Sequence, residues 1–122
     1  MAAPRPVVHV VDDDASYLKA IARLLRAAGF EVATYDAAEP FLAREPRDGA
    51  GCVLCDLSMP GMDGADLLAR VKEISPDCVR LILSGHSDTA SIMKTVGTAH
   101  QYLNKPCDPE LLKRTIKRAY VG

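Results

Sequence analysis

Several short apolar runs in this sequence end in side chains that could do chemistry. These side chains are Asp12, Asp13, Asp56, Ser84 and Lys105. An acidic residue at the carboxyl end of a buried strand lies where open α/β sheets bind their ligands. Together the side chains comprise three carboxylates, one hydroxyl and one amine, so a polar, largely acidic site is expected.

A group of carboxylates held close together needs a cation. Two carboxylates about 4 Å apart repel each other by roughly 4 kcal/mol at an effective dielectric constant near 20. An oxygen-only site suits Mg²⁺ rather than zinc, and Mg²⁺ typically binds one or two carboxylates together with phosphate oxygens. Ser84 and Lys105 add a hydrogen-bond donor and a positive charge of the kind that phosphoryl oxygens use. The set predicts a phosphoryl-transfer site whose nucleophile is a carboxylate.

Strands that alternate with helices are needed to bring these residues together. Apolar runs predict strands over residues 7–11, 30–35, 52–56, 79–83 and 100–103. Helical spacing predicts helices over residues 15–28, 36–45, 65–74 and 88–96, and from residue 108 or 109 to residue 120. Five such alternations imply a parallel sheet with helices on both faces and right-handed connections. The carboxyl ends of all the strands then lie at one edge of the sheet.

Apolar positions at helical spacing predict which side chains the helices bury. The first helix is expected to bury Leu18, Ile21, Ala22, Leu25 and Ala28, the third Leu67, Leu68, Val71 and Ile74, and the fourth Ile92, Met93 and Val96. Asp14 and Asp63 are placed to cap the helices that follow them, and Gly29 is expected to end the first helix. A capping box from Asp36 to Glu39 is expected to start the short second helix.

Length and composition are those of one soluble globular domain. A chain of 122 residues can bury one hydrophobic core, so a single domain over residues 1–122 is expected, with residues 1–6 as a loose tail. The apolar content of 48% and the charged content of 25% are ordinary, and a net charge of −1 argues against direct nucleic-acid binding. The apolar runs are strand-sized and no signal peptide precedes them, so no membrane association and a cytoplasmic location are expected.

The four cysteines are expected to be reduced and structural. Cys52 and Cys55 are three residues apart in a predicted strand, so their side chains point to opposite faces. No second Cys or His pair lies at zinc-finger spacing, and Cys78 and Cys107 are isolated. Free cysteine is among the most buried residue types, which favours neutral thiols in the core over disulfides or zinc.

Several motifs together resemble a known family over essentially the whole chain. They are the pair Asp12-Asp13, the stretch Asp56-Leu57-Ser58-Met59-Pro60-Gly61-Met62-Asp63-Gly64, Ser84, and Tyr102-Leu103-Asn104-Lys105-Pro106. In this order and spacing the chain resembles a receiver domain of a two-component response regulator. The resemblance implies a flavodoxin-like (βα)5 three-layer sandwich with a central parallel five-stranded sheet of order 2-1-3-4-5.

The resemblance also implies a role for the acidic residues. Asp56 would accept a phosphoryl group from the phosphohistidine of a sensor histidine kinase or a histidine phosphotransfer protein. Mg²⁺, for which Mn²⁺ could substitute, would be held by Asp13, Asp56 and the backbone carbonyl of Ser58, with Asp12 assisting through water. The chain would catalyse its own phosphorylation and dephosphorylation without being a turnover enzyme.

Three further residues receive roles from the same resemblance. Lys105 would contact the phosphoryl group, while Ser84 and Tyr102 would form a switch pair. The switch would reshape the surface made by the predicted helix over residues 88–96, the strand over residues 100–103 and the last helix. An output domain or effector protein would bind that surface, and a phosphorylation-dependent homodimer is a further expectation.

Two other classes of protein share part of this pattern. A Mg²⁺-dependent phosphatase of the haloacid-dehalogenase type also uses an Asp nucleophile after a strand, but it needs a second acid two residues later, where this chain has Ser58. A nucleotide- or flavin-binding domain would need a Gly-rich phosphate loop, which the residues after Val11 do not offer. Ser58 and His86 are further candidates for the site, since a side chain beside the phosphoryl group can assist or block an attacking water.

Overall fold

The computed structural model describes residues 7–43, 51–57, 59, 61–74, 78–85, 93, 95, 97–104 and 108–121. Some predictions fall on other parts of the chain. The expected tail over residues 1–6, most of the helix predicted over residues 88–96, and the positions of Ser58, His86, Lys105 and Cys107 all lie outside the described residues.

Five parallel strands form the centre of the molecule. They are β1 (Val7–Val11), β2 (Glu31–Tyr35), β3 (Gly51–Asp56), β4 (Val79–Ser84) and β5 (Gln101–Asn104). Their order in the sheet is β2-β1-β3-β4-β5, and every pair is parallel. The predicted fold class and strand order are therefore confirmed.

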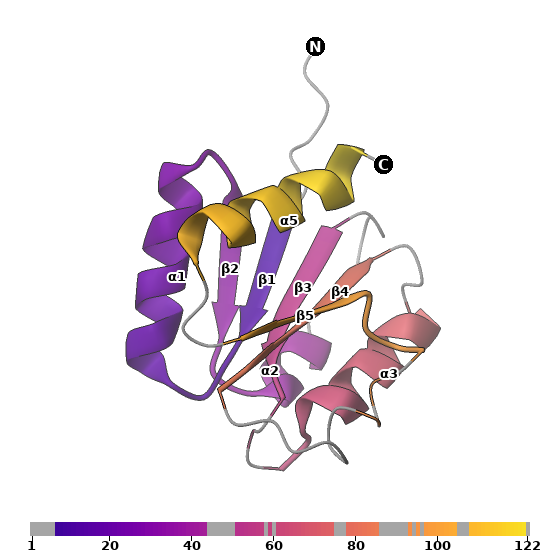
Figure 1. The fold of residues 1–122 in the computed structure, drawn as a ribbon. Helices are drawn as coiled ribbons and strands as arrows, with labels where there is room; N and C mark the ends of the chain where they lie inside the picture. Colours follow the sequence, from indigo (N-terminus) through magenta and orange to yellow (C-terminus); the bar gives the residue numbers. More distant parts are fainter. Residues whose placement is uncertain are drawn as a thin grey trace.

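Helices cover both faces of this sheet (Figure 1). The described helices are α1 (Ala15–Ala27), α2 (Ala38–Ala43), α3 (Gly64–Ile74) and α5 (Pro109–Val121). One core cluster joins α1 and α5 to the sheet, and the other joins α3 and Ala38 of α2 to the opposite face. Cys52 belongs to the first cluster and Cys55 to the second, as their spacing in β3 predicts. All residues of β3 are buried, because helices cover this central strand on both sides.

Local signals in the sequence place the ends of two helices. The Asp14 side chain accepts a hydrogen bond from the Tyr17 amide at 3.2 Å, and the Asp63 side chain accepts one from the Asp66 amide at 2.9 Å. Gly29 follows α1 with a φ of 96°, a conformation that side chains larger than hydrogen disfavour. The two predicted N-caps and the glycine stop are confirmed.

Gly51 is the first residue of β3, one residue before the start of the predicted strand. It pairs with Val7 of β1, and a Cβ atom at this position would lie 3.1 Å from the carbonyl oxygen of Val7. The close approach of the two backbones therefore explains the glycine.

Three predictions of buried side chains are wrong. Ile74 is 50% exposed because it is the last residue of α3, and the buried face of that helix ends one turn earlier at Val71. Met93 is 62% exposed, whereas Thr95 is completely buried. Thr95 rather than Met93 is therefore the residue of this segment that enters the interior. Ala28 is only half-buried, because it is the C-cap of α1 and lies beyond its last turn.

Candidate functional site

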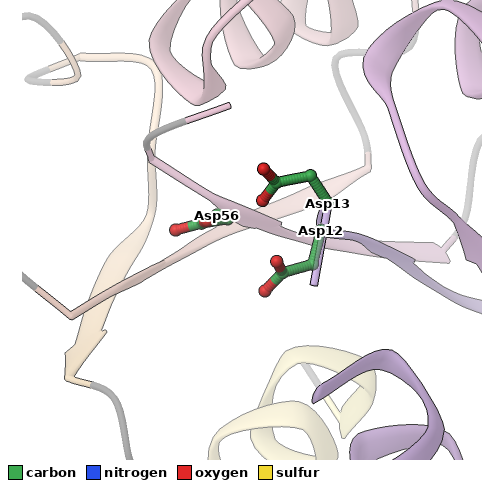
Figure 2. A group of neighbouring side chains, drawn as sticks. All are labelled: Asp12, Asp13 and Asp56. Carbon is green, nitrogen blue, oxygen red and sulfur yellow. The ribbon is translucent and has the colours of Figure 1, made fainter. Parts of the chain in front are cut away.

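Three carboxylates meet at the carboxyl edge of the sheet. Asp12 and Asp13 directly follow β1, and Asp56 is the last residue of β3. The two strands are neighbours with Val11 opposite Cys55, so Asp12 and Asp56 occupy adjacent positions at this edge. One carboxylate oxygen from each of the three aspartates lies within 4.8 Å of the others (Figure 2). We refer to Asp12, Asp13 and Asp56 as the acidic cluster.

The three carboxylates differ in burial and in hydrogen bonding. Asp12 is 1% exposed and Asp56 is 9% exposed, whereas Asp13 is exposed to solvent. The Asp12 carboxylate accepts a hydrogen bond from the Asp14 amide at 2.9 Å, and the Asp12 amide donates to the carbonyl of Tyr35 at 3.0 Å. Asp12 is therefore fixed by the start of α1 and by β2, while Asp13 is open to a ligand from solvent.

The backbone around Asp56 is held by its neighbours on two sides. The next amide, that of Leu57, donates to the carbonyl of Leu83 in β4 at 3.1 Å. The Gly64 amide at the start of α3 donates to the carbonyl of Leu57 at 3.0 Å. A Cβ atom at Gly64 would lie only 2.4 Å from the carbonyl oxygen of Asp56. Only glycine therefore allows α3 to begin this close to the end of β3. The position of Gly64 in the sequence does not indicate this contact.

The donor set of the acidic cluster fits a hard divalent cation such as Mg²⁺. It consists of three carboxylates from two strand ends, with no histidine among them. Cys55 is one residue from Asp56, but burial raises the pKa of its thiol far above the ordinary value, and the charges of Asp56 and Asp12 raise it further. A neutral thiol is a poor metal ligand. The cluster can thus provide oxygen ligands alone.

The predicted switch residues lie on the two strands beyond the cluster. Ser84 is the last residue of β4 and is 8% exposed, next to the strand that ends in Asp56. Tyr102 of β5 is 39% exposed and pairs with Ile82, two residues before Ser84. Because alternate residues of a strand share a face, Ser84 and Tyr102 lie on the same side of the sheet. The structure thus brings together the acidic cluster and places Ser84 on the adjacent strand end.

The sequence did not predict two buried polar side chains, one in β4 and one in the segment before β5. Arg80 is 6% exposed, and Thr95, whose side chain hydrogen-bonds Tyr102, is completely buried. The one signal for Arg80 was a charged residue inside the apolar run from Val79 to Leu83. A threonine in a helical pattern gives no such signal, since only the fold brings it next to the tyrosine.

Comparison with known proteins agrees with this geometry. The model of the response regulator receiver domain family matches residues 8–117, so the chain belongs to this family. The transcriptional regulatory protein FixJ of Bradyrhizobium diazoefficiens is 36% identical over 113 residues, which span 92% of this chain and 55% of FixJ. The C4-dicarboxylate transport transcriptional regulatory protein DctD of Rhizobium meliloti is 33% identical over 115 residues, which span 93% of this chain and 25% of DctD. The chain thus spans only about a quarter to a half of the length of these relatives.

Solved receiver domains have the same fold. The beryllofluoride-activated DrrB receiver domain superposes with a TM-score of 0.86 at 29% identity, covering 98% of this chain and all of that one. The signal receiver domain of an HD domain-containing protein from Pseudomonas fluorescens gives a TM-score of 0.85 at 28% identity, covering 95% of this chain and 94% of that one. The predicted family is confirmed, and receiver domains of response regulators are signalling domains. None of the helices in the described part of the chain is long and apolar enough to cross a membrane.

Proposed function

We propose that this chain is the phosphoacceptor switch of a two-component phosphorelay, formed by one domain over residues 1–122. The observation that carries the proposal is the acidic cluster at the carboxyl edge of the sheet, where Asp56 lies between Asp12, which follows β1, and Ser84 of β4. In the proposed reaction a carboxylate oxygen of Asp56 attacks the phosphorus of a phosphohistidine. The bond to the imidazole nitrogen breaks as the new bond forms, and the nitrogen keeps the electron pair.

The other acidic residues would hold Mg²⁺ or Mn²⁺ for this step. Asp13 and Asp56, with the backbone carbonyl of Ser58, are the proposed direct ligands, and Asp12 is proposed to assist through water. The hydrogen bond from the Asp14 amide to Asp12 supports this division, because it already occupies one oxygen of the Asp12 carboxylate. When bound, the cation would offset the negative charge that an anionic phosphoryl donor meets at the cluster.

Phosphorylation would be communicated through Lys105, Ser84 and Tyr102. A phosphoryl group brings roughly two negative charges at neutral pH, which Lys105 would contact and toward which the Ser84 hydroxyl would turn. Tyr102 lies on the same sheet face as Ser84, so its ring could follow the movement. The changed surface would include β5 and α5 and would be read by an output domain or effector protein. The phosphoryl donor would be a sensor histidine kinase or a histidine phosphotransfer protein.

Acetyl phosphate provides a direct test of this proposal. We expect the chain to gain the mass of one phosphoryl group, and to gain it only when Mg²⁺ or Mn²⁺ is present. Asp56→Asn should abolish the gain. Asp63→Asn is the matched control, because this residue caps α3 outside the acidic cluster. Intact-mass spectrometry would follow the reaction, and full labelling of Asp56→Asn would rule out Asp56 as the acceptor.

A further inference from the structure

Tyr102 is held by a buried side chain that the function described above does not use. Its phenolic oxygen accepts a hydrogen bond from the hydroxyl of Thr95, which is completely buried although Tyr102 itself is 39% exposed. The bond thus joins a fixed interior group to a ring at the surface. For the ring to move inward, this hydrogen bond must break or Thr95 must move with it.

The segment that follows Thr95 is tied to β4 by a buried arginine. The Arg80 Nε atom donates to the carbonyl of Thr98, and its Nη1 atom donates to the carbonyl of Cys78 at 3.1 Å. The Arg80 amide donates to Nδ1 of His100 at 2.9 Å, and the His100 amide donates to the Arg80 carbonyl at 2.7 Å. Two of these contacts satisfy donors of the guanidinium, and the other two are made by the Arg80 backbone. Because Arg80 is only 6% exposed, such hydrogen bonds lower the cost of burying its charge.

Further hydrogen bonds connect the segment held by Arg80 to Thr95 itself. The Ala99 amide donates to the Thr95 carbonyl at 2.9 Å, and the Thr98 hydroxyl donates to the same carbonyl at 3.1 Å. From the other side, Nζ of Lys72 in α3 donates to the carbonyl of Gly97 at 2.8 Å. Thr95 is thereby fixed relative to both β4 and α3.

We propose that Thr95 is a latch that holds Tyr102 in its half-exposed position. The regulatory consequence rests on the proposed function: the latch would favour the resting conformation over the one that phosphorylation induces. A neutral intramolecular hydrogen bond of typical strength changes such an equilibrium by roughly 2- to 12-fold. Loss of the Thr95 hydroxyl should therefore make the switch easier to activate.

The test compares three variants labelled with 3-fluorotyrosine. Thr95→Val removes the hydroxyl and keeps the shape, whereas Thr95→Ser keeps the hydroxyl. Thr115→Val is the matched control, because Thr115 is also a buried threonine but its hydroxyl donates to the Leu111 carbonyl in α5. Fluorine NMR without any phosphoryl mimic, with Tyr102→Phe to assign the signal, reports the latch directly. We expect the Tyr102 signal to move in Thr95→Val and to stay in place in Thr95→Ser and Thr115→Val.

Beryllofluoride binding in the presence of Mg²⁺ then reports the regulatory consequence. We expect the concentration for half-saturation to fall roughly 2- to 12-fold in Thr95→Val and to remain at the wild-type value in the other two variants. An unmoved Tyr102 signal in Thr95→Val would overturn the latch, and an unchanged beryllofluoride affinity would overturn its role in regulation. Failure of the wild type to bind beryllofluoride would instead count against the proposed function, because the fluorine signal is measured without the mimic.

Discussion

The residues of the acidic cluster differ in their burial and in their hydrogen bonds. Asp12 is buried and takes part in the start of α1 through the Asp14 amide, so its carboxylate is a structural acceptor as well as a possible ligand. Asp13 is exposed and extends the cluster toward solvent. Because its oxygen lies within 4.8 Å of two other carboxylates, its charge is repelled when no cation is present.

Asp13→Asn should therefore separate metal binding from stability. We expect it to weaken Mg²⁺ binding far more than Ser84→Ala does, since the first change removes a charged ligand and the second removes only a hydroxyl. In metal-free buffer Asp13→Asn should raise the free energy of unfolding by about 1 kcal/mol, because one repulsive charge at an exposed position is removed. The variant should therefore unfold at a higher urea concentration. Titration of backbone amide shifts near Asp56 and urea unfolding measure the two effects. Equal Mg²⁺ affinities in the two variants would contradict the metal site.

At the scale of helices and strands, the position of α3 depends on Gly64. The start of this helix packs against the end of β3 so closely that a Cβ atom would overlap the carbonyl oxygen of Asp56. The obstacle is backbone rather than the end of a flexible side chain, so the helix or the strand end must shift. Movement of the strand end displaces the residue that is proposed to accept the phosphoryl group. Movement of the helix start disturbs the hydrogen bond from the Gly64 amide to the carbonyl of Leu57, the residue next to it.

Gly64→Ala should consequently reduce both stability and phosphorylation. We expect a loss of about 1–3 kcal/mol in unfolding free energy, the usual range for overpacking, together with slower labelling by acetyl phosphate. Ala69→Gly in the same helix is the control, because it costs about 1 kcal/mol through helix propensity without approaching Asp56. Normal labelling of Gly64→Ala at saturating Mg²⁺ would show that the Asp56 backbone tolerates the shift.

The sequence predicts the elements more reliably than the contacts between them. Alternating apolar runs are sufficient for the parallel sheet, and the side chains of Asp14 and Asp63 mark the helix starts, because these signals are local. The exposure of Met93 and the burial of Thr95 were not predicted, since both depend on tertiary packing rather than on a local signal. The acidic cluster could be predicted because its residues lie at the ends of predicted strands. The contact of Gly64 with Asp56 depends on the packing of α3 against β3, so it required the structure.

The buried thiols report on the integrity of the whole molecule. Burial raises the pKa of Cys52 far above the ordinary value, and it raises the pKa of Cys78 to about 11. Cys52, Cys55 and Cys78 are all free and buried, the first in one core cluster and the other two in the cluster on the opposite face of the sheet. Their reactivity therefore depends on unfolding rather than on local exposure.

We expect Cys52 and Cys55 to resist alkylation by iodoacetamide at pH 8 in the native protein and to react once urea unfolds it. The folded state should also lose stability as the pH rises above about 9, the ordinary thiol pKa, because the unfolded chain then releases protons that the folded chain retains. Mass spectrometry of alkylated peptides and urea unfolding at pH 7.5 and pH 10 test both expectations. Replacement of Cys52 by Ala should reduce the pH dependence, and rapid labelling of native Cys52 would contradict its burial.

The pairing of β1 with β3 also has a consequence for the newly made chain. Asp12 and Asp56 are far apart in the sequence and become neighbours only when these two strands pair across the intervening β2 and α2. Parallel pairings of this kind form slowly, because the entropy of closing a long loop is lost before the contacts between the strands stabilise the pair. An incompletely folded chain therefore has no acidic cluster. Under the proposed function, such a chain would not accept a phosphoryl group from a kinase. Only the folded chain could then be phosphorylated, so immature or damaged copies would not pass on a signal.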